Sequence, residues 1–231
     1  MIAITSDIDW ASDYVIDYFL DILDKYSIKS TFFCTHKVSI KKHELGIHPN
    51  FSGNEDHEKI LKNILKLFPK AKGVRSHRLI NSSPLYSLYK KFNLVYDSSY
   101  MIPLTPSKPF MKYPGILEIP ISFEDDLYFS NPSKTFKINE LHLNPKKLFI
   151  FNFHPIHIYL NTNSMQHYQK SKMYSHNSDK LKLCRSNKRG TRDLLIELLE
   201  YISKKDIEIL TLKQINNKIR MGKKNETTRY S

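Results

Sequence analysis

Two carboxylates lie close together near the N-terminus, directly after an apolar segment. Asp7 and Asp9 are separated only by Ile8 and follow the apolar residues 2–4. Residues two apart in a strand point to the same side, so we expect both carboxylates on one face. Burying such a pair is costly unless it binds a cation or takes part in acid–base chemistry. Taken alone, however, the pair is more simply explained as a solvated strand end in which Asp9 caps the next helix.

Histidines at the ends of other strand-like segments change this interpretation. His48 ends one short segment, and His77 ends the next, two residues after Arg75. One aspartate and two histidines on neighbouring strand ends form a facial set of ligands for a catalytic divalent cation, with positions left for water and substrate. We therefore expect Asp9, His48 and His77 to hold a metal ion.

Further candidates for acid–base chemistry follow a later apolar strand. His154 ends the strand expected at residues 148–153, the most apolar of the chain. A neutral imidazole at this place could donate a proton to a leaving amine, and His157 could exchange roles with it. Arg75, beside the carboxylates, would keep one of them ionised and oriented. The acidic segment 118–126 could bind sugar hydroxyls or could equally be a solvated turn.

The elements that must position these side chains alternate between strand and helix. Helices are expected after the potential caps Ser12 and Asp56, from Ser83, and over residues 191–203 and 213–221. Repeated strand–helix units imply a mainly parallel sheet, either open or closed into a barrel. The expected strands cover residues 2–9, 28–35, 45–48, 72–77, 94–96, 116–121, 148–153 and 207–210.

The length of 231 residues fits one large domain, which we place at residues 1–221. Residues 161–190 interrupt the strand–helix pattern, being rich in Ser, Asn, Lys and His, and we expect a mobile surface loop or a lid. Residues 222–231 are expected to be a flexible tail. The basic side chains near the loop could bind phosphate or an anionic glycan, although a solvated surface explains them more simply: Lys180, Lys182, Arg185, Lys188, Arg189 and Arg192.

The net charge of +13 favours acidic partners, unless it reflects only a lysine-rich solvated surface. The two cysteines, Cys34 and Cys184, form neither a disulfide framework nor a zinc-ribbon pattern. No Gly-rich phosphate loop or zinc finger supports a specific nucleic-acid function. The N-terminus lacks the apolar stretch of a signal peptide, and no apolar run is long enough to be a transmembrane segment, so we expect a cytoplasmic location.

Read in order, five motifs resemble those of the polysaccharide deacetylase (NodB-homology) superfamily. Their variants are most similar to the deacetylase-like proteins of bacterial lipopolysaccharide O-antigen synthesis. The resemblance spans roughly residues 2–215 and implies a distorted (β/α) barrel of about seven parallel strands. The motifs are Thr5-Ser6-Asp7-Ile8-Asp9, His43-Glu44-Leu45-Gly46-Ile47-His48-Pro49-Asn50, Arg75-Ser76-His77, Tyr96-Asp97-Ser98-Ser99 and Phe151-Asn152-Phe153-His154-Pro155.

The resemblance also implies roles for individual residues. Asp7 matches the catalytic base, His154 the general acid and Arg75 the residue that positions the base; Asp9 and His48 match metal ligands. The family has a second metal histidine four residues after the first, where this chain has Ser52. We expect His77 to replace it, with His57 as the alternative; if neither reaches the ion, an inactive relative is the better interpretation. Residues expected to contact the substrate are Trp10, Asp97, Asp125 and His157.

We therefore expect a metal-dependent hydrolase that removes an N-acyl group from an amino sugar in surface-polysaccharide or lipopolysaccharide synthesis. N-acetyl is the first candidate for the acyl group. One divalent ion is expected, namely zinc, with cobalt, nickel, manganese or iron as alternatives. The expected partner is an amino sugar or glycan, whether anionic, nucleotide-linked or lipid-linked. Two alternatives stay open: an amidase acting on a small non-sugar amide, and a catalytically inactive relative that binds glycan or nucleic acid.

Overall fold

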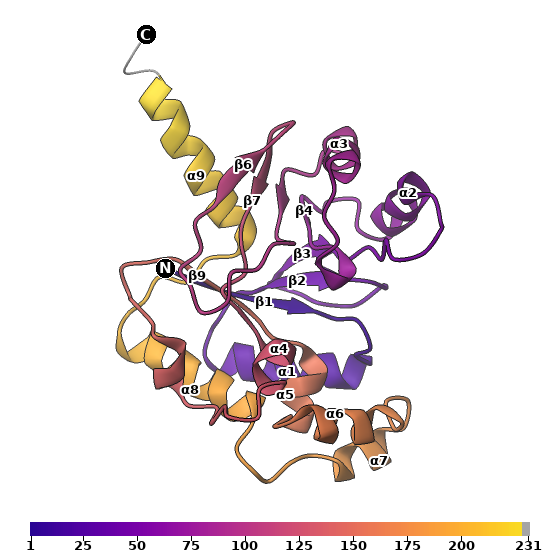
Figure 1. Cartoon of the computed structure of the whole chain (residues 1–231), viewed down its shortest axis with the longest axis vertical. Helices are drawn as coiled ribbons and strands as arrows, with labels where there is room; N and C mark the ends of the chain where they lie inside the picture. The colour runs from indigo at the N-terminus through magenta and orange to yellow at the C-terminus, as the bar shows by residue number, and fades with distance from the viewer. Residues whose placement is uncertain (228–231) are drawn as a thin grey trace.

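The structure is a computed structural model that describes residues 1–227 (Figure 1). One sheet runs through it in the order β6-β7-β5-β4-β3-β2-β1-β9-β8, and β6–β7 is its antiparallel pair. The sheet is curled, and its edge strands β6 and β8 do not pair with each other within residues 1–227, so it forms a half-barrel. The strands are β1 (Ile2–Asp7), β2 (Thr31–Cys34), β3 (Glu44–Ile47), β4 (Gly73–Val74), β5 (Tyr96–Asp97), β6 (Phe110–Lys112), β7 (Ile116–Glu118), β8 (Phe123–Glu124) and β9 (Phe149–Asn152).

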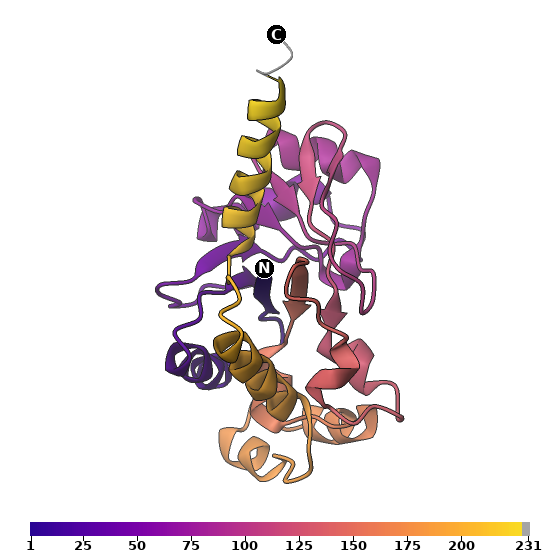
Figure 2. The ribbon, with the colours of Figure 1, turned by 90° about the vertical axis from the view of Figure 1, so that its left-hand side faces the viewer.

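Helices pack on both sides of this sheet. In Figure 1, α1, α5 and α8 lie below the central strands, and α2 and α3 lie at the opposite end of the molecule from α8. Figure 2 shows α9 extending away from the sheet. The α-helices are α1 (Asp13–Lys25), α2 (His57–Leu67), α3 (Ser83–Lys91), α4 (Asp125–Phe129), α5 (Pro155–Leu160), α6 (Met165–Lys172), α7 (Ser178–Leu183), α8 (Thr191–Lys204) and α9 (Leu212–Thr227), and two short 3₁₀ helices are η1 (His77–Leu79) and η2 (Ile138–Leu141). None of the helices within residues 1–227 is both long and apolar enough to cross a bilayer.

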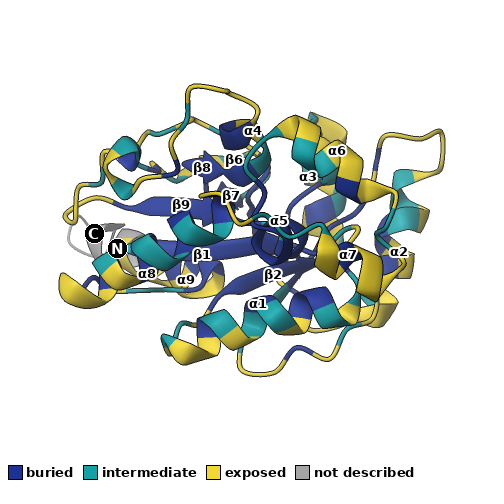
Figure 3. Cartoon of the chain, turned by 90° about the horizontal axis from the view of Figure 1, so that it is seen from below, coloured by how far each residue is buried: buried dark blue, intermediate teal, exposed yellow. Residues whose placement is uncertain are grey.

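The central strand β1 is buried along its whole length, because parallel strands covered by helices on both faces have no solvated side (Figure 3). It pairs with β2 on one side and with β9 on the other. In this register Asp7 lies opposite Phe33, and Thr5 lies opposite Asn152. The carboxyl ends of β1, β3, β4 and β9 therefore meet at one edge, which is where α/β barrels carry their functional side chains.

The amphipathic pattern of the sequence correctly predicts the main helices. Val15, Phe19 and Leu23 form the buried face of α1. The Asp56 side chain caps α2 as expected, since its Oδ1 accepts a hydrogen bond of 2.7 Å from the Glu58 N–H. Ser12 occupies the N-cap position of α1, but its hydroxyl makes no capping hydrogen bond.

The prediction of a distorted α/β barrel is confirmed, while several element boundaries differ from expectation. Residues 207–210 do not form a strand; Ile209 makes only an isolated bridge to Ile2. The short strands β6 and β8 and the helices α4 and α5 were not expected, because segments of two to six residues carry too little periodicity.

Residues 161–190 are not a continuous loop, because α6 and α7 lie within them. Ser164 caps α6 by accepting a hydrogen bond from His167 N–H, and Asn177 caps α7 by accepting one from Lys180 N–H. Leu181 anchors α7 in the core. These helices are short and mostly polar, so hydrophobic spacing does not reveal them.

At the C-terminus α9 continues to Thr227, beyond the end expected at residue 221. The part of the expected tail at 222–227 is therefore helical, and residues 228–231 lie outside the described part of the chain.

Candidate active site

A cavity of about 200 Å³ opens at the carboxyl ends of the central strands, and we call it the strand-end cavity. It collects acidic side chains, histidines and aromatic residues from segments far apart in the sequence. Its lining residues are Asp7, Asp9, Trp10, His48, Ser76, His77, Arg78, Leu79, Glu124, Asp126, His154, Ile156, His157 and Tyr168.

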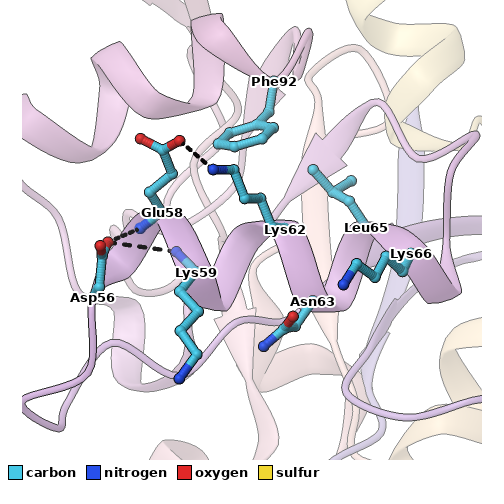
Figure 4. A pocket seen from close by; sticks show the side chains of 8 residues that line it. All are labelled: Asp56, Glu58, Lys59, Lys62, Asn63, Leu65, Lys66 and Phe92. Carbon is cyan, nitrogen blue, oxygen red and sulfur yellow. Dashed lines mark hydrogen bonds and ion pairs between the residues drawn. The ribbon is translucent and has the colours of Figure 1, made fainter.

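A larger hollow of about 770 Å³ lies elsewhere, along the exposed side of α2 (Figure 4). Five of its eight lining side chains are charged, three of them lysines, and Lys62 pairs with Glu58 at 2.8 Å. Residues of α2, its N-cap Asp56 and Phe92 form this depression, and they bring together no histidine or buried carboxylate. The strand-end cavity is smaller, but of the two it is the one that combines histidines with buried carboxylates.

Asp9, His48 and His77 come together on one side of the strand-end cavity. Asp9 Oδ1 lies 3.7 Å from His48 Nε2, and Asp9 Oδ2 lies 3.4 Å from His77 Nδ1. Two ligands about 2.1 Å from a tetrahedral zinc ion would be roughly 3.4 Å apart. The spacing of the three side chains is thus close to that of a coordination sphere.

Unpartnered polar atoms are a second sign that this group fits a cation. Asp9 Oδ1, which faces His48 Nε2, is buried and has no hydrogen-bond partner within the described residues. His48 Nδ1 also has none there, and it lies on the Asp7 side of the ring, 3.9 Å from Asp7 Oδ1. Such atoms are costly to bury unless a ligand satisfies them. Burial lowers the pKa of His48 although Asp7 and Asp9 act to raise it, so its imidazole is neutral, the form that binds metal ions.

Two other groups have the spacing of metal ligands, but their atoms are already engaged. One is Asp125, His154 and His157, and the other is Asp7, Glu124 and His154. Both oxygens of Asp125 accept hydrogen bonds from His154, through its backbone N–H and its Nδ1. Asp7 pairs with Arg75, which lies outside these groups. The group of Asp9, His48 and His77 therefore fits an ion best.

Asp7 is buried beside that group and is held by two partners. Arg75 Nη1 donates a hydrogen bond of 3.0 Å to Asp7 Oδ1, and Asn152 Nδ2 donates one of 3.0 Å to Asp7 Oδ2. Burial alone would raise the pKa of Asp7, but the charges of Arg75 and His154 and the hydrogen bond from Asn152 together hold it below its usual value. Asp7 is consequently an ionised carboxylate at neutral pH, as a proton acceptor requires.

Arg75 is fully buried, and its guanidinium is fixed from several sides. Its Nε donates to the Ser98 carbonyl at 2.9 Å, its Nη2 donates to Ser98 Oγ at 3.0 Å, and its Cζ lies 4.4 Å from the centre of the Phe33 ring. A cation fixed in this way orients the Asp7 carboxylate as well as stabilising its charge.

His154 lines the same cavity as His48, which follows β3, and His77, which begins η1. Its Nδ1 is 2.7 Å from Asp125 Oδ1, and its Nε2 is 4.0 Å from Asp7 Oδ2. Burial acts to lower the pKa of His154, but Asp125, with Asp126 and Asp7, raises it well above its usual value. The structure thus presents a protonated imidazole opposite an ionised carboxylate, which is the pairing needed for acid–base catalysis.

Two of the residues expected to contact substrate line the strand-end cavity. Trp10 lies at its mouth, 61% exposed, with Lys172 Nζ 4.8 Å from the ring centre. His157 is buried between the rings of Phe129 and Tyr168, and its Nδ1 is 3.2 Å from Thr162 Oγ1. Burial lowers the pKa of His157 well below its usual value, so it is neutral and differs from His154 in its charge.

The other two expected substrate contacts lie elsewhere. Asp97 is fully buried and pairs with Lys112 at 3.1 Å, outside the cavity lining. Asp125 is fully buried under His154 and orients that imidazole. Both carboxylates follow strands in the sequence, but a strand end can point into the core as well as into a cavity, and only the packing decides which.

Ser52, four residues after His48, and His57, the alternative to His77, both lie apart from the site. Ser52 is exposed, and its hydroxyl donates to Asn50 Oδ1 at 2.6 Å. His57 begins α2 and packs against Phe51. Among these candidates, His77 is the one that lies beside Asp9 and His48.

Sequence reasoning assigned no role to Asn152 and considered Glu124 only as part of the acidic segment 118–126. Asn152 stands two residues before His154, and its amide bridges Asp7 and Glu124, at 3.0 and 3.4 Å. The two-residue spacing in a strand was the available signal. Glu124 gives no such signal, since it ends a strand too short to predict. Burial and then the charge of Asp126 raise the pKa of Glu124 to about 7.

The chain is similar to known proteins along most of its length. A family model described as WbmS-like polysaccharide deacetylase matches residues 4–172. A crystal structure from Bordetella bronchiseptica, described as a polysaccharide deacetylase (WbmS) involved in O-antigen biosynthesis, aligns at 30% identity and a TM-score of 0.78, over 87% of this chain and 90% of that chain. No curated protein matches the chain.

More distant structures share the fold. The peptidoglycan deacetylase PdaC from Bacillus subtilis aligns at 14% identity and a TM-score of 0.54, over 100% of this chain and 96% of that chain. A 4-alpha-glucanotransferase from Thermococcus litoralis aligns at 14% identity and a TM-score of 0.52, over 94% of this chain and 38% of that chain. At such identities the likeness concerns the half-barrel alone.

Proposed function

Because the chain belongs to the WbmS-like polysaccharide deacetylase family, and is thus a carbohydrate deacetylase, we propose that it removes an N-acetyl group from an amino sugar with the help of one divalent metal ion. One observation carries the proposal. A possible ligand group of Asp9, His48 and His77 lies beside the ion pair of Asp7 with Arg75. Metal binding and proton transfer would therefore act on the same small volume.

The metal ion would be held by Asp9, His48 and His77, with zinc as the first candidate. When bound there, it supplies Lewis-acid polarisation of the acyl carbonyl. Cobalt, nickel, manganese or iron could serve in its place, because imidazole and carboxylate ligands suit all of them. The remaining chemistry belongs to side chains of this chain.

Asp7 accepts the proton of the attacking water. Its low pKa keeps the carboxylate free of a proton at neutral pH, and the hydrogen bonds from Arg75 and Asn152 fix its orientation. His154 then donates a proton to the departing nitrogen through Nε2, since its Nδ1 faces Asp125. Each of these proton transfers is of the kind that contributes about 10²–10⁴-fold to the rate.

We also propose a setting in surface-polysaccharide or lipopolysaccharide synthesis. The supporting observation is the likeness to the Bordetella protein, which is described as involved in O-antigen biosynthesis. The net charge of +13 favours an anionic substrate, such as a nucleotide-linked or lipid-linked sugar. Such substrates suit a cytoplasmic enzyme, which is the location we propose.

Release of acetate tests the proposal. The purified protein is loaded with Zn²⁺ or Co²⁺ and incubated with free, nucleotide-linked and lipid-linked N-acetyl amino sugars, and acetate is measured. We expect release from at least one substrate and a loss of about 10²–10⁴-fold in the Asp7→Asn variant.

The controls separate the alternatives. Small cyclic and linear amides are included in the panel, and turnover of these alone would identify an amidase instead. Metal-loaded protein that releases no acetate, yet binds glycan or nucleic acid in a strongly salt-dependent way, would identify an inactive binding protein. Asp7→Asn should still bind metal, because Asp7 lies outside the ligand group of Asp9, His48 and His77.

A further inference from the structure

The helices α6 and α7 expose two large apolar side chains, and the chemistry above makes no use of them. Met173, the C-cap residue of α6, is 75% exposed, and Leu183, the last residue of α7, is 86% exposed. Each stands two residues after a buried residue, Ser171 or Leu181. Because successive helix residues are about 100° apart, both apolar side chains lie on the side of their helix that faces away from the core.

Basic side chains accompany these apolar residues. Residues 165–189 contain seven Lys or Arg and one acidic residue, Asp179. The two arginines are held by the body of the fold, Arg185 by a hydrogen bond to a tyrosine of α1 and Arg189 by an ion pair with a glutamate of α8. The lysines are all exposed, and none forms an ion pair with a described carboxylate: Lys170, Lys172, Lys180, Lys182 and Lys188.

The mouth of the strand-end cavity lies beside these helices. Trp10 lines that cavity and also a narrow space that it shares with residues of α6 and α7, among them Lys172 and Leu181. The Lys172 ammonium stands over the exposed Trp10 ring. Figure 1 shows α6 and α7 together at one end of the molecule, and Figure 3 shows how much of them is exposed. We call the surface formed by these side chains the α6–α7 face: Trp10, Met173, Leu183 and the five lysines.

We propose that the α6–α7 face docks on the surface of a bilayer that contains anionic phospholipids. The free ammonium groups complement the negative charge of such a surface, which the cytoplasmic leaflet carries. Met173, Leu183 and Trp10 then enter the zone between the headgroups and the acyl chains. Tryptophan with lysine beside it is typical of the boundary between membrane and water. Asp179 is the one carboxylate of residues 165–189 that the lipid charge repels.

Neither a nucleic acid nor a second copy of the chain fits this face as well. Proteins that bind nucleic acids use arginine for phosphate contacts, but Arg185 and Arg189 are engaged within the fold. A phosphate backbone would also leave the apolar Met173 and Leu183 without a favourable contact. Two copies of the face would bring lysines against lysines, because both carry the same sign of charge.

Docking through this face would hold the cavity mouth against the bilayer, since Trp10 belongs to both. The substrate would then be the lipid-linked amino sugar rather than the nucleotide-linked one, a consequence that rests on the proposed function. The docking itself is independent of that function, because it requires neither Asp7 nor the ligand group of Asp9, His48 and His77.

Flotation with lipid vesicles measures the docking. The full chain is mixed with vesicles of phosphatidylethanolamine and phosphatidylglycerol, or with vesicles of phosphatidylcholine alone. We expect binding to the anionic vesicles that weakens as salt is raised, and binding at least about tenfold weaker to the neutral ones. Trp10 is the single tryptophan of the chain, so its fluorescence should move to shorter wavelength when the vesicles bind. Binding without this change would refute docking through the α6–α7 face.

Charge reversal tests the lysines. The double variant Lys180→Glu with Lys182→Glu should bind at least about tenfold more weakly, since each basic side chain near an anionic surface contributes about fivefold. Lys146→Glu with Lys147→Glu makes the same change in net charge at exposed positions before β9, at the end of the strands opposite the cavity. This control should bind nearly as the wild type does, and an equal loss in both double variants would refute the proposal.

An apolar change tests the other half of the face. Leu183→Asp should weaken vesicle binding by at least about tenfold, because it removes a buried apolar contact and adds a repelled charge. Leu67→Asp, at 47% exposure on α2, is the matched control and should bind as the wild type does. Single-stranded DNA is the competing probe. Tighter binding to DNA than to the anionic vesicles, unchanged in Leu183→Asp, would identify a nucleic-acid surface and refute membrane docking.

The outcomes separate this inference from the proposed function. Asp7→Asn should bind vesicles as the wild type does, and Leu183→Asp should release acetate from a water-soluble substrate as the wild type does, which also shows that it is folded. Vesicle binding with these properties, without acetate release from any substrate, would support the docking and refute the deacetylase. Acetate release without binding to the anionic vesicles at low salt would refute the docking alone.

Discussion

Two buried ionic clusters lie on the same sheet and differ in what surrounds them. The closed cluster, at β5–β7, consists of Asp97, Glu118 and Lys112, with Lys112 Nζ pairing with both carboxylates and lying 4.3 Å from the Tyr86 ring centre. The open cluster consists of the groups at the strand-end cavity around Asp7 and Arg75. Both remove charges from water, but the open cluster lines a cavity, whereas the unpartnered oxygen of the closed cluster, Glu118 Oε2, lies beside the Lys112 ammonium.

The charge balance of each cluster explains the difference in protonation. In the closed cluster two carboxylates share one ammonium, so burial and then the charge of Asp97 raise the pKa of Glu118 to about 8. In the open cluster Asp7 has the Arg75 guanidinium and an amide donor, and its pKa falls below the usual value despite burial. A buried charge is therefore no sign of function in itself. An ionised group beside unsatisfied atoms and a cavity is the more specific indication.

The largest expected effect concerns the ligands of the open cluster. His48→Ala should abolish stoichiometric metal binding and deacetylase activity, because it removes one of three ligands. His57→Ala is the matched control and should retain both, since His57 begins α2 and lies outside the ligand group. Elemental analysis of dialysed protein measures the metal. A His48→Ala protein that keeps one ion per chain would refute the assignment.

A change in the closed cluster should affect stability rather than chemistry. Lys112→Met leaves two carboxylates buried without their cation, and we expect a loss of about 3–5 kcal/mol in the free energy of unfolding. Lys108→Met, at an exposed position of the same segment, should change it by less than about 0.5 kcal/mol. Urea unfolding measures both. If Lys112→Met were as stable as the wild type but inactive, the division between the two clusters would be wrong.

The pairing of His154 with Asp125 predicts a shift in the pH profile. Asp125 raises the pKa of His154, so Asp125→Asn should lower that pKa. On the alkaline side of the profile, activity should then be lost at a pH about one to three units lower than in the wild type. Asp126→Asn should produce a smaller shift, because Asp126 makes a weaker contribution to the same pKa. The measurement is kcat against pH. An unchanged alkaline limb in Asp125→Asn would exclude His154 as the general acid.

The smallest effect is expected at Glu124, which lines the strand-end cavity. Its pKa is about 7 in the folded protein and near 4.5 when unfolded, so its ionisation destabilises the fold as the pH rises between these values. Glu124→Gln should therefore be more stable than the wild type by about 1–2 kcal/mol near pH 8, with the difference vanishing near pH 4.5. Thermal unfolding at both pH values tests this. A variant that is less stable at about pH 8 would show that the ionised carboxylate is needed there.

Much of the site could be predicted because its residues occupy fixed places relative to strands. Asp7, Asp9, His48 and His154 all follow apolar segments that parallel pairing brings to one edge. Regular alternation of strands and helices predicted the mainly parallel sheet, and the resemblance to polysaccharide deacetylases predicted the distorted barrel. Asp97 was expected to contact substrate because, like those four residues, it follows an apolar segment. Its side chain lies instead in the closed cluster, beside Lys112.

The sequence by itself determined the order of strands and helices and the set of polar residues at the strand ends, because both depend on local periodicity. Tertiary structure alone decided which of those residues share a cavity. The Asp125 carboxylate meets His154 only because β8 is placed beside β9, and His77 reaches Asp9 only because β4 pairs with β3. Partners so far apart in the chain are chosen by sheet pairing and packing, and no spacing in the sequence encodes them directly.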